Sequence, residues 1–455
     1  MRIPRLKAAV ILFLFCAVIL PGRAQTADTN QPPSWLSRPI SLADALNLAL
    51  RQNGSILRGK SDLEAQYGVV VQTRAVAIPK LQVAGNYQAT GETEQFPFPN
   101  PPPAQDQTWN ANIQVVQAIY QGGQINSALR TAKLTKDQAL LQYQTVIADS
   151  LLLVRIAYYD VLSAAEQVVV EEASVKLLTQ ELDDQTRRYQ AGTVPRFNVL
   201  RAEVELANER PRLIQARNTH RVAKNNLVNL LGYHVPPNVP EDVPMELTDK
   251  LDAEPYKIEL PVAIGRAFES RSELAALRKQ ESLRKEGVTT AEGGYKPTVQ
   301  LFGGYGGRNT TFNNDLGRVV RGAFGGAQLS WSIFDGLLTK GRVDQARALH
   351  EGSRVDVQNE MRSVELEVRT DYSNFIEASE TLESQKKVQE EAEEALRLAT
   401  ARSEAGTGTQ LDVLSAQTSL TQARSTQVQA LHDYDVARAR LERAMGINIM
   451  QTMGK

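Results

Sequence analysis

The sequence predicts a mostly helical protein with some β-structure, built as a tandem duplication of very long coiled-coil helices and short strand pairs. Three observations predict this fold class. Motifs of the first half recur in the second half at a near-constant spacing. Apolar residues repeat every 3.5 residues over long segments, as in a coiled-coil seam. Four shorter segments alternate apolar and polar residues with period two, as half-buried strands do. The duplication indicates one double-length architecture, although the 455 residues alone would suggest roughly three domains.

Composition excludes several classes of function. The 51 basic residues nearly balance the 52 acidic ones, which excludes a strongly basic nucleic-acid binder. A single cysteine builds neither a zinc ribbon nor a disulfide scaffold. The four histidines have no partner at metal-ligand spacing, and no nucleophile–base pair stands out. We therefore expect no metal site, no cofactor and no catalytic residues.

The N-terminus has the pattern of a secretory signal peptide. Three basic residues, Arg2, Arg5 and Lys7, precede an apolar run at 8–20 and small residues before Gln25. The run of 13 residues is too short to cross about 30 Å of hydrocarbon. We therefore expect residues 1–24 to be removed on export. No later stretch has 18 consecutive apolar residues, so membrane contact would need a β-barrel or an interfacial surface.

Recurring motifs define the two repeats. Ala-Gly-Thr at 191–193 recurs at 405–407, an offset of 214 residues, whereas motifs upstream of the first strand pair are offset by 218. The four-residue difference falls around the Pro-rich segment 96–103, which indicates a surface loop there. The expected organisation is signal peptide 1–24, N-terminal linker 25–39, first repeat 40–232, Pro-rich linker (equatorial region) 233–258, second repeat 259–447 and tail 448–455.

Each repeat is predicted to run helix, strand, loop, strand, very long helix, tight turn and helix. The long helix of the first copy covers about 123–190, and its apolar residues at 147–168 step by four and three. At about 1.5 Å per residue this helix is roughly 100 Å long. Residues 368–382 keep the same register in the second copy. Because proline removes a backbone hydrogen bond, Pro211 predicts a kink or break near Glu209.

The expected strands cover 81–89, 109–119, 299–305 and 327–333, with longer alternating segments of ten to thirteen residues around them. Such segments are long enough to cross a bilayer when tilted. Glycines at 303–307 indicate close packing within a strand rather than a phosphate loop. An ordinary half-buried soluble sheet remains the alternative, and the membrane interpretation requires oligomerisation because four strands cannot close a barrel. Aromatic residues suited to a membrane-interface girdle are Tyr87, Trp109, Tyr305 and Trp331.

Two tight turns are predicted between the helices of each copy. Gly192 and Gly406 permit the positive φ that commonly ends a helix. Thr409 with Asp412 is the pattern of a capping box for the helix that follows. Pro195 fits the first turn of the corresponding helix in the first copy.

Taken together, these features resemble the TolC family of outer-membrane efflux proteins, also called outer membrane factors, over about residues 40–447. The resemblance implies a homotrimer in which three chains of four strands form a 12-stranded transmembrane β-barrel. The helices would extend this barrel as a tube through the periplasm, and the loops at 91–107 and 308–321 would face outward. The most specific motifs are Tyr-Gln-Ala-Gly-Thr at 189–193 with Val-Leu at 199–200, and Glu-Ala-Gly-Thr at 404–407 with Asp-Val-Leu at 412–414.

The resemblance also implies a function. The trimer would be a channel-tunnel that gives substrates passive exit, in efflux or type I secretion. These substrates would be delivered by an inner-membrane RND or ABC transporter together with a periplasmic adaptor (membrane fusion) protein. The alternative is a soluble periplasmic coiled-coil scaffold or adaptor, which would purify without detergent. In the family the hairpin tips contact the adaptor, although simple hairpin geometry explains their motifs as well. The tip residues are Ala191, Gly192, Thr193, Ala405, Gly406 and Thr407.

The periplasmic gate departs from the family pattern. Asp412 matches the first acidic position of the second tip, whereas Ser415 stands at the second, Gly408 where the family has Arg, and Asn198 at the partner acidic position of the first copy. We therefore expect a gate held mainly by packing. Three Asp412 side chains brought to the axis would favour cations, while a helix-capping role for Asp412 is the alternative.

Overall fold

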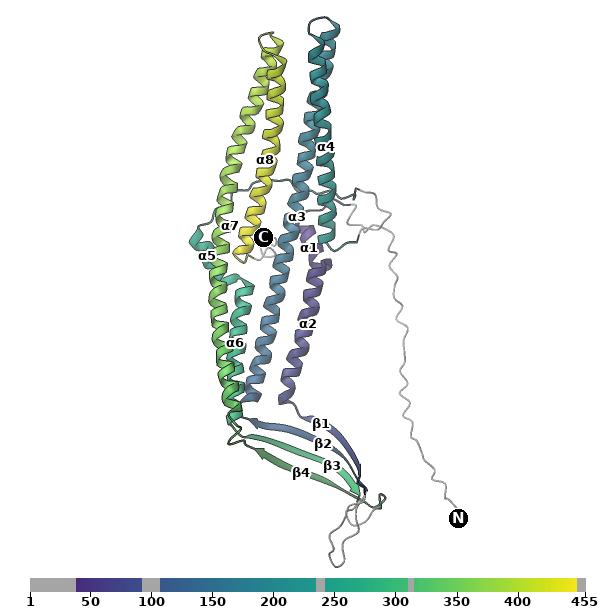
Figure 1. Cartoon of the computed structure of the whole chain (residues 1–455), viewed down its shortest axis with the longest axis vertical. Coiled ribbons are helices and arrows are strands. Elements are labelled where there is room, and N and C mark those ends of the chain that lie inside the picture. The colour runs from purple at the N-terminus through teal and green to yellow at the C-terminus, as the bar shows by residue number, and fades with distance from the viewer. Residues whose placement is uncertain (1–37, 92–106, 235–241, 310–314, 448–455) are drawn as a thin grey trace, which may run out of the picture.

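The computed structural model describes residues 38–91, 107–234, 242–309 and 315–447 (Figure 1). The expected signal peptide, the C-terminal tail and most of the N-terminal linker lie outside the described residues. The first repeat contains α1 (Leu42–Gln52), α2 (Gly54–Arg74), β1 (Lys80–Ala89), β2 (Gln107–Gln121), α3 (Gln124–Gln190) and α4 (Arg196–Leu230). The second contains α5 (Leu260–Ser270), α6 (Ser272–Glu292), β3 (Thr298–Asn309), β4 (Val319–Ser330), α7 (Leu338–Glu404) and α8 (Gln410–Ala444).

The helices of the two repeats have matching lengths. α1 and α5 have 11 residues, α2 and α6 have 21, α3 and α7 have 67, and α4 and α8 have 35. The single helix expected before each strand pair is wrong, because it is divided in two. At Asn53 the backbone leaves the helical region, and the side chain caps α2 by accepting from the N–H groups of Ser55 and Ile56.

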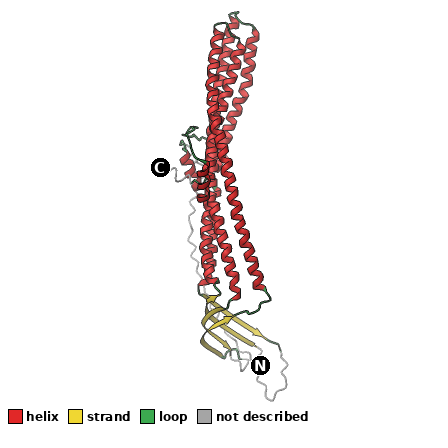
Figure 2. Cartoon of the chain, turned by 90° about the vertical axis from the view of Figure 1, so that its left-hand side faces the viewer, coloured by secondary structure: helices red, strands yellow, loops and turns green. Residues whose placement is uncertain are grey.

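The molecule is long and narrow, with the sheet at one end and the two helical hairpins at the other (Figures 1 and 2). α3 and α7 run the whole length of the helical part, about 100 Å at 1.5 Å per residue. α2 and α6 lie beside the halves near the sheet, and α4 and α8 beside the halves near the tips. No helix within the described residues carries an apolar stretch long enough to cross a membrane.

The strands form one antiparallel sheet in the order β1-β2-β3-β4, so β2 and β3 join the two repeats. Alternation along the paired strands gives the sheet one predominantly apolar face, where Leu81 and Val83 are 68% and 78% exposed. The opposite face carries amide side chains such as Gln82 and Gln114, which hydrogen-bond to each other across β1 and β2. The predicted alternation is therefore found in the structure.

Two strand boundaries differ from the expectation. β4 ends at Ser330, so Trp331 and Ile333 lie beyond the strand. The last pair is Thr298 with Ser330, and the preceding Pro297 has no N–H with which to continue the ladder. The loop expected at 308–321 is shorter, because β3 continues to Asn309 and β4 begins at Val319.

Asn309 explains the longer strand end. Its side-chain oxygen accepts the N–H of Trp109 at 2.9 Å, and its amide nitrogen donates to the carbonyl oxygen of Gln107 at 2.9 Å. The side chain thus continues the hydrogen bonding between β2 and β3 beyond the backbone ladder, and it is itself buried.

Two apolar cores lie at the waist, where α1 packs on α3 and α5 on α7. Leu151, Val154, Tyr158 and Val161 of the predicted seam are buried in the first core, together with Val243 and Met245 of the linker. Ala165 and Val168, which continue the predicted seam, are only half-buried. Phe375 and Tyr434 anchor the second core, with ring centroids 5.3 Å apart.

Of the kink or break that Pro211 predicts near Glu209, the break is wrong. α4 runs from Arg196 to Leu230 without interruption and has the same length as α8. One face of α4, including Leu206 and Ala216, is buried over its length. Packing along α3 therefore outweighs the roughly 3 kcal/mol that an internal proline costs a helix.

Gly304 and Gly303 offer a matched test of the sheet. A Cβ on Gly304 would lie 2.3 Å from the carbonyl oxygen of Ile113, whereas one on Gly303 would meet nothing nearer than 3.8 Å. We expect Gly304→Ala to destabilise the sheet by about 1–3 kcal/mol through overpacking. Gly303→Ala should change stability by less than about 0.5 kcal/mol. Thermal unfolding followed by circular dichroism measures both, and equal effects of the two substitutions would contradict this register.

Candidate functional site

The two hairpin tips have the same geometry. Gly192 and Gly406 follow α3 and α7 with φ of 73° and 74°, in the left-handed region that favours glycine. In both tips the next residue satisfies the end of the helix: Thr193 donates its N–H and hydroxyl to the carbonyl oxygen of Arg188, and Thr407 does the same to Arg402. Helix termination therefore accounts for both Ala-Gly-Thr motifs.

The same motifs leave the tips exposed. Ala191, Gly192 and Thr193 are all exposed, and so are their counterparts Ala405, Gly406 and Thr407. Neither Gly192 nor Gly406 has an atom within 4 Å of where a Cβ would stand. The tips thus present a small, uncluttered surface beyond the helices.

Of the predicted gate positions, Gly408, Asp412 and Ser415 lie close to the start of α8, whereas Asn198 lies in the first turn of α4. The carboxylate of Asp412 accepts the N–H of Thr409 at 2.9 Å and its hydroxyl at 2.8 Å, which completes the predicted capping box. These hydrogen bonds, with a further contribution from Arg402, lower the pKa of Asp412. Both Asp412 and Ser415 are exposed. Asp412 is therefore an exposed, ionised helix cap.

Gly408 is close to the end of α7. A Cβ there would stand 3.0 Å from the backbone nitrogen of Ser403 and 3.1 Å from the Cβ of Arg402. Its N–H donates to the same Arg402 carbonyl oxygen as Thr407. This close approach explains glycine at a position where the family pattern has arginine.

Asn198 contacts α8 through its backbone carbonyl group rather than through its side chain. Gln410, the first residue of α8, donates its side-chain amide to the carbonyl oxygen of Asn198 at 3.1 Å and lies 3.4 Å from the carboxylate of Glu181. The contact between the first tip and α8 is therefore made by a neutral amide. Sequence reasoning did not identify Gln410 or Glu181, because the residues lie more than 200 positions apart.

Polar side chains also connect α3 to α8 along the rest of their length. This α3–α8 seam contrasts with the apolar packing inside the waist, and it contains one small apolar cluster of Leu178, Leu206 and Leu414. The polar pairs of the seam, from the tip toward the waist, are Gln410–Glu181, Thr421–Ser174, Ser425–Gln167, His432–Asp160, Glu442–Arg155 and Arg443–Asp149.

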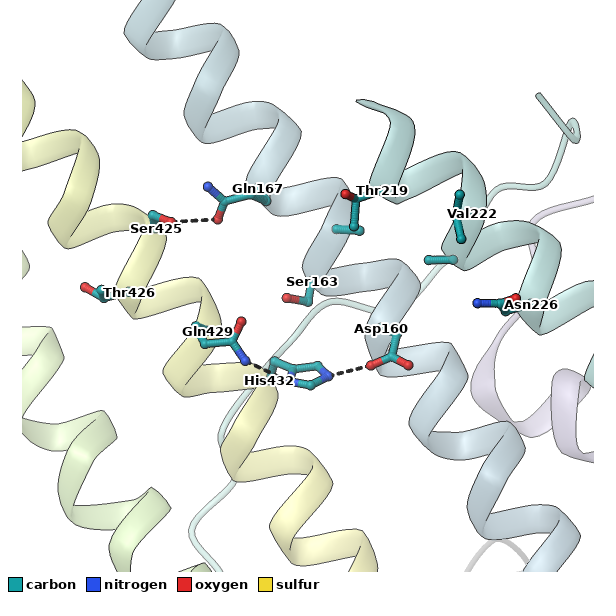
Figure 3. A pocket seen from close by; sticks show the side chains of 12 residues that line it. Asp160, Ser163, Gln167, Thr219, Val222, Asn226, Ser425, Thr426, Gln429 and His432 are labelled. Atoms are coloured by element: carbon teal, nitrogen blue, oxygen red, sulfur yellow. Dashed lines mark hydrogen bonds and ion pairs between the residues drawn. The ribbon is translucent and has the colours of Figure 1, made fainter. Parts of the chain in front are cut away.

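His432 stands in a polar groove of about 610 Å³ lined by α3, α4 and α8 (Figure 3). Its Nε2 lies 2.7 Å from Asp160 of α3, and its Nδ1 lies 3.0 Å from Asp433 of α8. Burial disfavours the imidazolium, but the hydrogen bonds that its ring N–H groups donate to Asp160 and Asp433, together with the negative charges of these carboxylates, outweigh it and raise the pKa of His432. The sequence predicted a plain surface or core histidine, whereas the structure makes it a bridge between the two repeats.

The four girdle residues lie toward both ends of the sheet. Tyr87 pairs with Trp109 near the loops, and Tyr305 pairs with Ile113 four positions further in. Trp331 lies just beyond β4, where its indole N–H donates to the carbonyl oxygen of Tyr295 beside the helices. Tyr87, Tyr305 and Trp331 are more than half exposed.

Among the residues that the structure describes, no group of three or more His, Cys, Asp or Glu side chains is arranged to hold a metal ion. The pockets between the long helices are open grooves or small gaps, and a further pocket lies on the sheet, between β2, β3 and β4.

Known proteins that resemble this chain do so over both of its repeats. The family described as "outer membrane efflux protein" matches residues 45–233 and 263–447, one segment in each repeat. The outer membrane protein TolC of Escherichia coli is 25% identical over 437 residues, covering 91% of this chain and 83% of that protein. The cobalt-zinc-cadmium resistance protein CzcC of Cupriavidus metallidurans is 24% identical over 419 residues, covering 91% and 92%. Among solved structures, the outer-membrane channel OprN superposes with a TM-score of 0.75 at 18% identity, covering 90% of each chain.

Two histidines give opposite pH dependences. The pKa of His432 is raised, so its bridge to Asp160 is fully present at low pH and is lost as the pH rises through the folded-state pKa. Burial and Lys224 lower the pKa of His220, so this residue costs stability as the pH falls. We expect His432→Gln to lower the unfolding midpoint more at about pH 6 than at about pH 8.5.

His220→Gln is the matched control and should show the reverse trend, measured in the same detergent by thermal unfolding at both pH values. Parallel profiles of the two variants would contradict the assignment of the His432 bridge.

Proposed function

The chain belongs to the outer membrane efflux protein family, and we propose that three copies of it assemble into a continuous duct across the outer membrane and the periplasm. The protein is an outer-membrane channel for efflux or type I secretion. Energy comes from the partner transporter, and the duct itself gives passive exit. The family is a transport family, and the described residues provide the parts of a conduit.

The observation that best supports trimer formation is that the four-stranded sheet is open at both edges. β1 and β4 each have one unpaired edge, and the apolar face of the sheet is exposed. Exposed edges and apolar surface of this kind require a partner. Pairing β1 of one copy with β4 of the next closes twelve strands around an axis, with the apolar face toward lipid and the amide face toward the lumen.

The proposed roles of the remaining parts follow from this orientation. Residues 1–24 direct export and are removed, and the repeats 40–232 and 259–447 supply equal parts of the barrel and the shaft around the 233–258 linker. Tyr87, Trp109, Tyr305 and Trp331 mark the two interfaces of the membrane. The loops expected at 91–107 and 308–321, whose central residues lie outside the described part of the chain, would face outward.

The exposed tips are the proposed contact with a periplasmic adaptor and, through it, with an inner-membrane RND or ABC transporter. Their support is the exposed Ala-Gly-Thr surface repeated in both hairpins. Six such tips, two from each chain, would ring the periplasmic entrance. Of the relatives compared, CzcC is by name a resistance protein, which agrees with an efflux assembly.

The proposed gate is held mainly by neutral contacts and packing. Gln410 links α8 to Asn198, and Gly408 leaves no charged side chain at the position of the family arginine. Asp412 and Ser415 are exposed at the start of α8. Three Asp412 carboxylates near the axis would favour cations at the closed entrance.

The soluble scaffold is the less favoured alternative. It would leave the apolar face around Leu81 and Val83 in water. A scaffold function also disagrees with the match of both repeats to the outer membrane efflux protein family. Reconstitution separates the two functions: liposomes containing the protein should release small trapped solutes, whereas a scaffold would leave them sealed.

Asp412 variants test the gate in planar bilayers. Asp412→Asn removes the charge but keeps an oxygen that can accept the Thr409 N–H, whereas Asp412→Ala removes both. If the charge sets selectivity, both variants should lose most of the cation preference, by about threefold or more in the permeability ratio. Ser415→Ala is the control and should match the wild type. Unchanged selectivity in Asp412→Asn would leave Asp412 with the helix-capping role alone.

A further inference from the structure

Two glutamates are buried side by side where α3, α4 and α8 meet, between the tips and the waist. Glu171 of α3 is 8% exposed and Glu209 of α4 is 7% exposed. Burying an ionised carboxylate is costly unless a cation or hydrogen-bond donors compensate its charge. Neither residue belongs to the tips, the gate or the sheet, so the transport function alone does not account for the pair.

Hydrogen bonds from α8 reach each glutamate separately. Thr421 donates to the hydroxyl of Ser174 at 3.1 Å, and Ser174 donates to Glu209 at 2.5 Å. These contacts join α8, α3 and α4 in one chain.

The second chain of hydrogen bonds ends on Glu171. Ser425 of α8 donates to the side-chain oxygen of Gln167 at 3.1 Å, and the Gln167 amide donates to Oε1 of Glu171 at 3.0 Å. The other oxygen of Glu171, Oε2, is buried and has no hydrogen-bond partner in the described structure. The two chains therefore end on two buried carboxyls, joined through α3 by Ser174, which lies one helical turn after Glu171, and Oε2 of Glu171 is left without a donor.

The surrounding charges do not neutralise both glutamates. From α4, the guanidinium of Arg212 lies 3.5 Å from Glu209, and its side chain is 59% exposed. Glu205 of α4 adds a further carboxylate to the wall of the adjoining cavity of about 210 Å³. The described α8 residues in that wall, Leu414, Gln417, Thr418 and Thr421, are uncharged. Arg212 therefore compensates one buried charge at most.

The electrostatics favour a neutral Glu171. Burial raises its pKa, and the negative charge of Glu209 raises it further, against the opposing effects of Gln167 and Arg212. Two carboxyls that share a buried site cannot both ionise cheaply. A proton on Oε2 would also supply the donor that this atom lacks.

We propose that Glu171 and Glu209 form a proton-binding site, in which one proton held between the two carboxyls joins the two hydrogen-bonded chains into a closed ring across α3, α4 and α8. When the proton leaves, two carboxylates face each other and the ring opens at the contact between α3 and α4. The site makes the junction of the first hairpin with α8 tighter as the pH falls. This inference does not depend on trimer formation or on transport.

The sign of the pH effect follows from linkage. A carboxyl whose folded-state pKa is raised favours the folded protein below that pKa, and this contribution is lost as the pH rises through it. Titration of His432 also removes stability with rising pH. The unfolding midpoints of the wild type and of a variant are therefore compared at each pH, so that the contribution of His432, which both share, cancels.

The test uses Glu171→Gln, which has the shape of the protonated side chain and can donate an N–H to Glu209. At about pH 8.5 its unfolding midpoint should equal or exceed that of the wild type, with a gain of about 2 °C. As the pH is lowered and the wild-type pair takes up its proton, the gain should vanish or reverse. Glu209→Gln should reduce the wild-type pH dependence in the same way.

Glu172→Gln is the matched control, because Glu172 is the adjacent residue, about half exposed, and paired with Arg217. It should keep the wild-type pH profile. A Glu171→Gln profile that runs parallel to the wild type would overturn the proposal. So would a rise in the wild-type midpoint on adding Mg²⁺ or Ca²⁺ that is absent from Glu171→Gln, because a metal ion would then occupy the site.

Discussion

The constraint on which the structure depends is that one chain supplies an incomplete sheet. Four strands with free edges on β1 and β4 leave backbone donors and acceptors unpaired, and their apolar face lies open. In the proposed trimer, pairing with other copies would satisfy the edges, and lipid would cover the apolar face. The antiparallel pairing of β2 with β3 holds the two repeats together at this end, and the helices extend from it as a shaft with tips at the far end.

The two repeats share lengths but differ in the chemistry that joins their helices. In the first, Asn53 caps α2 and donates its amide to Leu230 at 2.7 Å. In the second, the equivalent Arg271 is buried and bonds to Glu367 and Glu273, each at 2.5 Å. The first junction is neutral and the second is ionic. The seam that joins α3 to α8 is also polar, so the second hairpin is attached to the first by contacts that charge and protonation can change.

Much of the fold followed from sequence because its signals are local and were repeated twice. The long helices, the turns at Gly192 and Gly406, and the capping box of Thr409 with Asp412 depend on residues within a few positions of one another. The division at Asn53 was missed because a single capping side chain causes it. The break at Pro211 was expected in error because burial along α3 opposes the local cost of proline.

The candidate site was less predictable for a related reason. His432 and Asp160 are 272 positions apart, and Ser425 and Gln167 are 258 apart. No sequence motif or hydrophobic periodicity reveals either pair, because each contact depends on how one helical hairpin packs against the other. The early end of β4 likewise depends on Pro297 in the partner strand rather than on β4 itself. Local chemistry therefore predicted the elements, and only the folded arrangement showed the seam between them.

Projection imaging of the protein purified in detergent tests the central claim most directly. The account predicts end views with three-fold symmetry and side views of a tube whose shaft is about 100 Å long. A compact monomer, or a rod that remains dispersed without detergent, would contradict it, because the open sheet would then be satisfied without the other two copies.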